Sequence, residues 1–150
     1  MRHLCVMIGG SRFAVPASEV REVGPAVAAR TLPGVPIWCR GFACARGQWM
    51  PLVHAAALLG MPLTPPTTLS RTLLLDDSKD PTQSVLIEVD AVDDLVQLDG
   101  TGVHPGLQVA AHPWLGALHP FGGGSVQVLL LGALRQHPEW RALAREAPAA

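Results

Sequence analysis

The stretch that decides the fold is residues 41–53, which read GFACARGQWMPLV. Apolar residues lie on both sides of the pair Arg46-Gly47, and each side has the length of a short strand. Glycine adopts the positive φ angles of tight turns without steric cost. The stretch therefore predicts two short strands that turn at Arg46-Gly47.

The rest of the chain repeats this pattern of short apolar runs between turn residues. Gly9-Gly10 separates the first two runs and suits a two-residue hairpin turn. Many short strands joined by Gly/Pro turns favour a barrel or sandwich architecture. The expected strands are residues 3–8, 12–15, 71–76, 84–90, 92–98 and 126–131.

Short helices and loops are expected between these strands. Ser18 could cap one helical turn over residues 19–22, and a helix over 53–59 should end at Gly60. Residues 61–70 hold three prolines and predict a loop, while residues 100–125 are rich in Gly, Pro and His and predict irregular structure. Pro138 should open a final helix.

Composition excludes several classes of protein. The chain has 150 residues, which predicts one domain over 1–150, and 49% of them are hydrophobic. The net charge of −1 and the lack of a basic patch argue against nucleic-acid binding. No apolar run approaches the ~20 residues of a membrane span, and the first residues lack a signal-peptide pattern, so we expect a cytoplasmic protein without direct membrane insertion.

The sequence offers no pattern that builds an active site or a metal centre. Its six histidines form no HxxxH, HxH or HExxH pairing, and its three cysteines lack zinc-type spacing. There is no GxSxG elbow, and the glycines at 122–124 lack the Lys-Ser/Thr of a phosphate loop. We therefore expect no catalytic residue, no metal and no cofactor.

Arg46 invites a structural interpretation. An arginine beside a turn glycine can reach back to a carboxylate on a neighbouring strand, and Glu22 is the attractive partner. A bidentate Arg–carboxylate pair of this kind would fix the two strands relative to each other. The alternative is that both residues are ordinary surface charges.

At these residues the sequence resembles the CheW family, the coupling proteins of bacterial chemosensory arrays. The matching features keep the family's order and spacing over about residues 4–136. They are Phe13, the segment VREV at 20–23, LPGVP at 32–36, Gly41, Arg46-Gly47, Pro51, the strand VLIEVDAV at 85–92, WLG at 114–116 and VLLL at 128–131.

The resemblance implies a mainly β fold of two packed SH3-like β-barrels, with a short C-terminal helix and a hydrophobic groove between or beside the barrels. We expect the lobes at roughly 12–66 and 67–125, with a closing strand and helix at 126–146.

The resemblance also implies a function without catalysis. CheW-like proteins bind the regulatory domain of the histidine kinase CheA and the cytoplasmic tips of chemoreceptors, which places them at membrane-associated receptor arrays. The residues that match the receptor- or kinase-contacting region are Val20, Glu22, Val23, Gly41, Arg46 and Gly47. Trp38, Phe42 and Trp49 are further candidates, either for the core or for the interface.

Two departures from the family pattern leave alternatives open. His54 stands where the family has Asp, and the family's Asp or Asn in the last segment is replaced within residues 131–134. The chain could therefore be a divergent member that binds a single partner, in an accessory or inhibitory role such as type IV pilus motility. A small enzyme is the remaining alternative, and it would require polar side chains that converge in a pocket.

Overall fold

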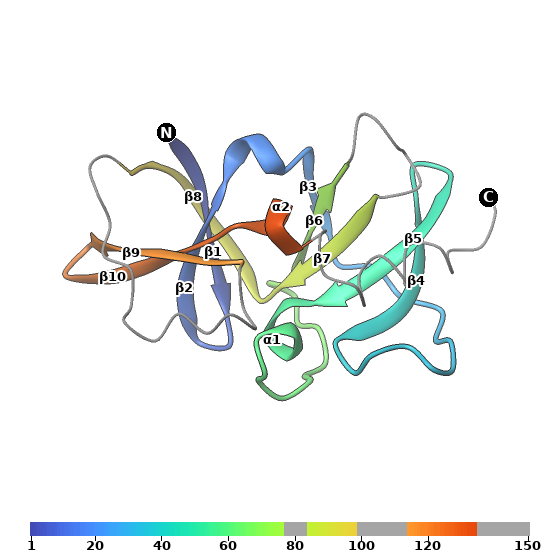
Figure 1. Cartoon of the computed structure of the whole chain (residues 1–150). Helices are drawn as coiled ribbons and strands as arrows, with labels where there is room; N and C mark the ends of the chain where they lie inside the picture. The colour runs from blue at the N-terminus through green and yellow to red at the C-terminus, as the bar shows by residue number, and fades with distance from the viewer. Residues whose placement is uncertain (77–83, 99–113, 135–150) are drawn as a thin grey trace.

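Two five-stranded sheets form the protein in its computed structural model, which describes residues 1–76, 84–98 and 114–134 (Figure 1). The first sheet has the order β8 (Ala91–Gln97), β1 (Arg2–Ile8), β2 (Ser11–Pro16), β10 (Gly124–Leu129) and β9 (Leu115–Phe121). The second has the order β3 (Glu22–Pro25), β6 (Arg71–Leu75), β7 (Val85–Val89), β5 (Gln48–His54) and β4 (Cys39–Ala45). The mainly β prediction is confirmed.

Both glycine turns form as the sequence predicted. Gly9 and Gly10 have φ angles of 59° and 82° and join β1 to β2 in an antiparallel hairpin. Arg46 and Gly47 have φ angles of 53° and 74° and join β4 to β5. Positive φ at both central residues gives the turn the twist that its flanking strands need.

The sheets divide the chain differently from the expected lobes at 12–66 and 67–125. Strands β1 and β2 from the start of the sequence share a sheet with β8, β9 and β10, while β3 to β7 form the other sheet. The reason is a parallel pairing of β10 with β2, in which Gln127 lies opposite Phe13 and Val128 opposite Ala14. The closing strand therefore completes the N-terminal hairpin's sheet.

Residues 115–121 form a strand, so the expectation of irregular structure is wrong for this part of 100–125. The strand β9 pairs with β10 across a turn at Gly122-Gly123. Pro120 is tolerated because β9 lies at the edge of its sheet, where one side of the backbone needs no ladder partner. Residues 99–113 and the helix expected from Pro138 lie outside the described residues.

The short helices differ in detail from the prediction. The expected turn at 19–22 is a 3₁₀ helix, η1 (Ala17–Glu19), that follows Pro16 without a side-chain cap from Ser18. The helix expected over 53–59 is shorter, α1 (Ala55–Leu58), and ends before Gly60, which has a φ of 86°. A further helix, α2 (Leu131–Leu134), follows β10.

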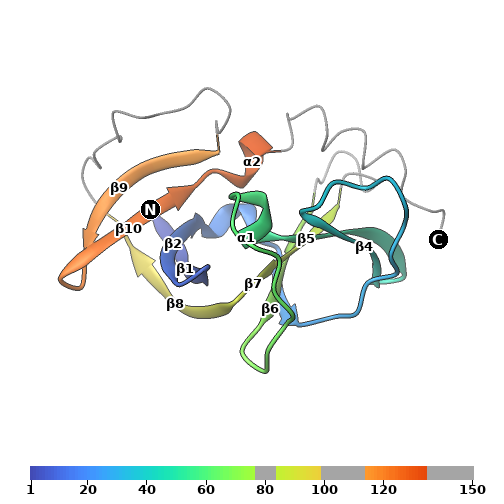
Figure 2. The same ribbon diagram turned by 90° about the horizontal axis from the view of Figure 1, so that it is seen from below.

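The main core fills the space between the two sheets, where α1 and α2 also lie (Figure 2). Alternate residues of β1 point into it, because successive side chains of a strand face opposite sides. Both sheets contribute to this core, which ties the two lobes together. Its fully buried members include Val6, Ile8, Val15, Val53, Leu73, Leu75, Val85 and Ile87.

The second sheet is closed by the chain that follows β3. Arg30 and Phe42 form an isolated bridge, in which the Arg30 amide donates to the Phe42 carbonyl at 2.7 Å and the Phe42 amide donates to the Arg30 carbonyl at 2.9 Å. Gly41 lies at this closure with a φ of 130°. A Cβ atom there would lie 2.1 Å from the Arg30 carbonyl oxygen, so the closure requires glycine.

Candidate functional site

Arg46 and Glu22 form the ion pair that the sequence suggested. The Arg46 Nε donates to Glu22 Oε2 at 2.9 Å, and the Arg46 Nη2 donates to the same oxygen. The pair joins the β4–β5 turn to the start of β3, which are the two edges of the second sheet. Because the two side chains are 52% and 48% exposed, the pair contributes less than about 1 kcal/mol to stability.

A shallow groove of about 120 Å³ lies beside this pair and is called the Glu22–Arg46 groove below. Its floor includes Leu74 and Leu86, which belong to a buried apolar cluster with Ala43, Met50 and Leu52. A charged rim over an apolar floor can receive an apolar side chain from another protein and orient it by charge. The lining residues are Glu22, Gly24, Pro25, Val27, Ala45, Arg46, Thr72, Leu74 and Leu86.

The six residues that the family resemblance singled out lie in three places. Glu22 and Val23 are exposed on β3, and Arg46 and Gly47 are exposed in the β4–β5 turn that faces it. Val20 is half-buried and packs against the core between the sheets. Gly41 is buried at the Arg30–Phe42 bridge.

The three aromatic candidates surround one small cluster beside β4 and β5. Phe42 is 1% exposed and belongs to the core, while Trp38 and Trp49 are half-buried and pack against it together with Leu32 and Val35. All three aromatic side chains pack next to the LPGVP segment, residues 32–36, and none of them lines the Glu22–Arg46 groove.

Sequence reasoning missed the floor of the groove. Thr72 and Leu74 come from β6 and Leu86 from β7, and they reach the groove through the pairing of β3 with β6 and of β6 with β7. In that register Glu22 lies opposite Leu74, and Leu74 lies opposite Leu86. Only the strand order could have revealed these neighbours.

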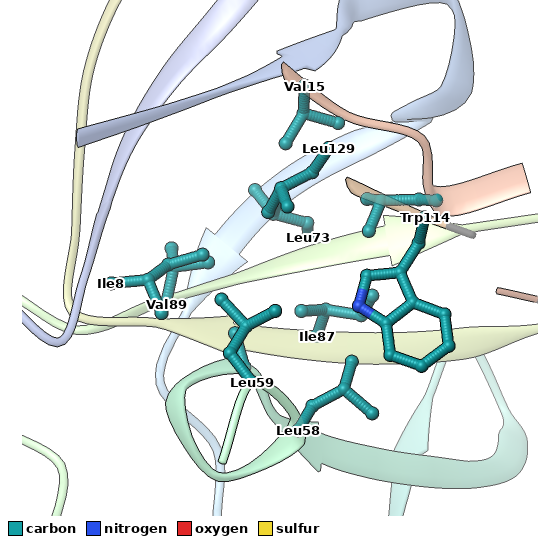
Figure 3. A pocket seen from close by; sticks show the side chains of 11 residues that line it. Ile8, Val15, Leu58, Leu59, Leu73, Ile87, Val89, Trp114 and Leu129 are labelled. Carbon is teal, nitrogen blue, oxygen red and sulfur yellow. The ribbon is translucent and has the colours of Figure 1, made fainter. Parts of the chain in front are cut away.

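A second candidate region is the apolar pocket between the sheets (Figure 3). Its volume of about 10 Å³ is close to the least that can hold one water, so the pocket is nearly filled by its own side chains. Figure 3 shows Leu58 of α1 and the next residue, Leu59, on one side of it and Trp114 on another. The remaining lining residues are Ile8, Val15, Ala55, Leu73, Ile87, Val89, Leu129 and Leu131.

Beside α1 lies a buried polar cluster that the sequence did not indicate as a unit. His54 and Glu88 have side chains that are 2% and 3% exposed, and their Nε2 and Oε2 atoms are 3.9 Å apart. Arg40 donates to Glu88 Oε2 from Nε at 3.1 Å and from Nη2 at 2.8 Å. The Arg40 Nη2 also donates to the Thr64 carbonyl, and this hydrogen bond links the loop over residues 61–70 to the cluster.

His54 performs the capping role for which aspartate is well suited. Its Nδ1 accepts a hydrogen bond of 3.2 Å from the Ala57 amide, and it is the N-cap of α1. Asp, Asn, Ser and Thr are the usual N-caps. His54 stands where the family has Asp, and because its ring makes the same capping bond, the helix keeps its cap. Burial lowers the pKa of His54, and the Arg40 charge lowers it further, while Glu88 and Asp90 act in the opposite direction.

The described residues contain no group of three or more side chains able to hold a metal ion. Burial raises the pKa of the Cys5 and Cys39 thiols, which disfavours the thiolate form that a nucleophile requires. In the part of the chain that the structure describes, no helix is long and apolar enough to cross a membrane.

Comparison with known proteins identifies a family and similar proteins. A family model described as CheW-like domain matches residues 2–138. Protein PilI of Pseudomonas aeruginosa is 35% identical over 69 residues, which make up 46% of this chain and 39% of that protein. The crystal structure of the scaffolding protein TtCheW from Thermoanaerobacter tengcongensis matches with a TM-score of 0.76 at 16% identity, and the match covers 92% of this chain and 94% of that one.

Proposed function

This chain belongs to the family of CheW-like domain proteins, and from that premise we propose that it couples chemoreceptor tips to a CheA-type histidine kinase in a bacterial chemosensory array. CheW-like proteins are non-enzymatic scaffolds of signal transduction, as the resemblance implied. The proposal adds the partners, namely the kinase regulatory domain and the receptor tip, and a cytoplasmic location at receptor arrays.

The Glu22–Arg46 groove is the observation that supports this proposal best. It combines a preorganised ion pair on the rim with buried leucines in the floor. Val23 beside it is 43% exposed and adds an apolar surface on the same strand. We propose that Glu22, Val23, Arg46 and Gly47 contact a partner, and that Val20 and Gly41 hold this surface in position from inside the fold.

Calorimetry tests the kinase arm of the proposal. The purified chain is titrated into the regulatory domain of the CheA-type kinase encoded next to it on the chromosome, and saturable one-to-one binding is expected. The receptor tip is the second titrant. A folded chain that binds neither would contradict the coupling role and leave the family membership intact.

Replacing Arg46 with alanine should weaken binding of the receptor tip by about 1–3 kcal/mol, because the partner loses a charged anchor at the groove rim. Folding should be almost unaffected, since the pair with Glu22 is exposed. The affinity is measured by calorimetry, and the unfolding midpoint by circular dichroism.

Arg21→Ala is the matched control for this experiment. Arg21 is also 52% exposed and paired with an acid, Asp76, yet it does not line the groove. Its replacement should leave the affinity unchanged. Equal losses in the two variants, or no loss in Arg46→Ala, would remove Arg46 from the contact surface.

The second candidate function is that of a divergent member that binds one partner only, in an accessory or inhibitory role such as type IV pilus motility. The replacement of the family's Asp by His54 motivates the single-partner role, and the local match to Protein PilI supports only the pilus setting. Adding the chain to a reconstituted mixture of kinase and receptor separates the two roles. A bridging protein promotes assembly of the array, whereas a single-partner protein suppresses it.

A further inference from the structure

The buried cluster around His54 has a property that the adaptor role does not require. His54, the last residue of β5, contacts three other parts of the fold: through its backbone the residue before β4, and through its ring the helix α1 and the loop over residues 61–70. Its amide donates to the Trp38 carbonyl at 2.8 Å, its Nδ1 caps α1, and its Nε2 lies 3.4 Å from Thr64 Oγ1. A change in the charge of the ring must therefore alter its contacts with α1 and with Thr64.

The hydrogen bonds of the His54 ring require the neutral form of the ring in the folded protein. Nδ1 accepts a hydrogen bond from the Ala57 amide, so in the neutral ring the only N–H is on Nε2. Protonation turns Nδ1 into a donor that faces the Ala57 N–H, and two donors cannot bond to each other. The cap of α1 is then lost.

The structure also offers a place for the protonated ring to turn. Glu88 directs both Arg40 bonds to Oε2, while its Oε1 is buried without a hydrogen-bond partner among the described residues. A buried carboxylate oxygen without a donor is costly, and an imidazolium N–H would satisfy it. His54 Nε2 lies 3.9 Å from the other oxygen of the same carboxylate, Oε2, so the ring is already next to Glu88.

Loss of the α1 cap also affects the apolar pocket between the sheets. The helix α1 consists of one short turn, and it supplies Leu58, whose successor Leu59 lies beside it in that pocket (Figure 3). A helix this short has little stability of its own, so the cap has a large share in holding both leucines against Ile87. Loss of the cap loosens one wall of the pocket.

We propose that His54 is a pH-dependent latch: neutral, it caps α1 and closes the pocket between the sheets; protonated, it turns to Glu88 and releases α1. The charged groups that face it are Arg40 from β4, Glu88 from β7 and Asp90 after β7, while α1 presents only apolar residues to it. The inference concerns this chain's own fold and does not depend on the identity of a partner.

The direction of the pH effect follows from comparing the pKa of His54 in the unfolded chain with its pKa in the folded chain. Burial lowers the pKa of His54 below its ordinary value of about 6.5, so the unfolded chain binds this proton more readily than the folded one. The contribution of the cap to stability is therefore complete above about pH 6.5 and is lost as the pH falls through the lower folded pKa.

Nuclear magnetic resonance of the whole chain tests the latch. At about pH 7.5 the ring nitrogen shifts of His54 should show a proton on Nε2 and none on Nδ1. As the pH is lowered through the folded pKa of His54, the protection of the Ala57 amide from hydrogen exchange, corrected for its intrinsic rate, should fall about fivefold, which is the usual effect of losing a cap. The methyl signals of Leu58 and Leu59 should shift with the same midpoint.

His54→Asn is the matched variant, because asparagine caps helices well and does not titrate. Its Ala57 protection should stay constant over the same pH range. The proposal is overturned if Nδ1 carries the proton at neutral pH, if the ring is not protonated above about pH 5, or if it is protonated without a change at Ala57. The same loss of protection in His54→Asn would overturn the proposal as well. The three outcomes named before it can be measured on the wild-type chain alone.

Discussion

Gly41→Ala is expected to destabilise the fold by about 3 kcal/mol or more. Two costs add together at this position. The φ of 130° lies in a region that essentially only glycine adopts, and the new Cβ would lie 2.1 Å from the Arg30 carbonyl oxygen. The obstacle is backbone, which cannot rotate away as a side chain could, so the two hydrogen bonds of the Arg30–Phe42 bridge must open.

Gly47→Ala is the control that separates the two costs. Gly47 also has a positive φ, 74°, but a Cβ there meets nothing within 4 Å. Its replacement should cost only about 1 kcal/mol. Urea denaturation followed by tryptophan fluorescence gives both values, and equal losses would show that the contact with Arg30 does not govern the closure.

This comparison also tests how Gly41 influences binding. A buried residue has no surface to offer a partner, so any effect of Gly41→Ala on affinity should appear together with lost stability. If the affinity fell while the unfolding midpoint stayed constant, Gly41 would have to act at the contact surface itself.

Glu88→Ala is expected to cost about 3 kcal/mol, because it leaves the Arg40 guanidinium without its carboxylate in a largely buried position. The Arg40 side chain is only 16% exposed, so water replaces the lost acid poorly. The loop over residues 61–70 should loosen at the same time, since Arg40 binds the Thr64 carbonyl. Thermal unfolding measures the first effect, and limited proteolysis of the loop measures the second.

Glu22→Ala is the matched control for Glu88→Ala. It removes a carboxylate from an arginine with similar bonds, but at the surface, where the loss should stay below about 1 kcal/mol. A similar loss of stability in both variants would mean that burial does not decide the strength of these pairs.

Local turn chemistry made much of the fold predictable. Gly9-Gly10 and Arg46-Gly47 each stand between apolar runs, and the positive φ angles that such turns need favour these residues. The pair of Glu22 with Arg46 was predictable for the same reason, since a turn fixes where its arginine can reach. Both Arg46 donors bind the same oxygen, Oε2, so the expected bidentate arrangement on two carboxylate oxygens does not form.

Pairings between distant strands were beyond the sequence. No tight turn joins β2 to β10 or β5 to β7, so these parallel pairings and the groove floor at Leu74 and Leu86 could not be predicted. Residues 115–121 were misjudged because Gly116 and Pro120 disfavour a strand locally, whereas the hairpin with β10 stabilises one. The role of His54 was hidden because its partners come from three other segments.

The parallel pairing of β2 with β10 has a consequence for how the protein is made. The strands β3 to β7 all lie within residues 22–89 and can pair as soon as that stretch has been synthesised. The hairpin of β1 and β2 leaves the ribosome first yet waits for Leu129 before its sheet is complete. At roughly 5–20 residues per second this interval lasts between about 5 and 25 seconds, during which an apolar strand edge stays open. The nascent chain is therefore most exposed to aggregation and to chaperones at the open edge of the β1–β2 hairpin.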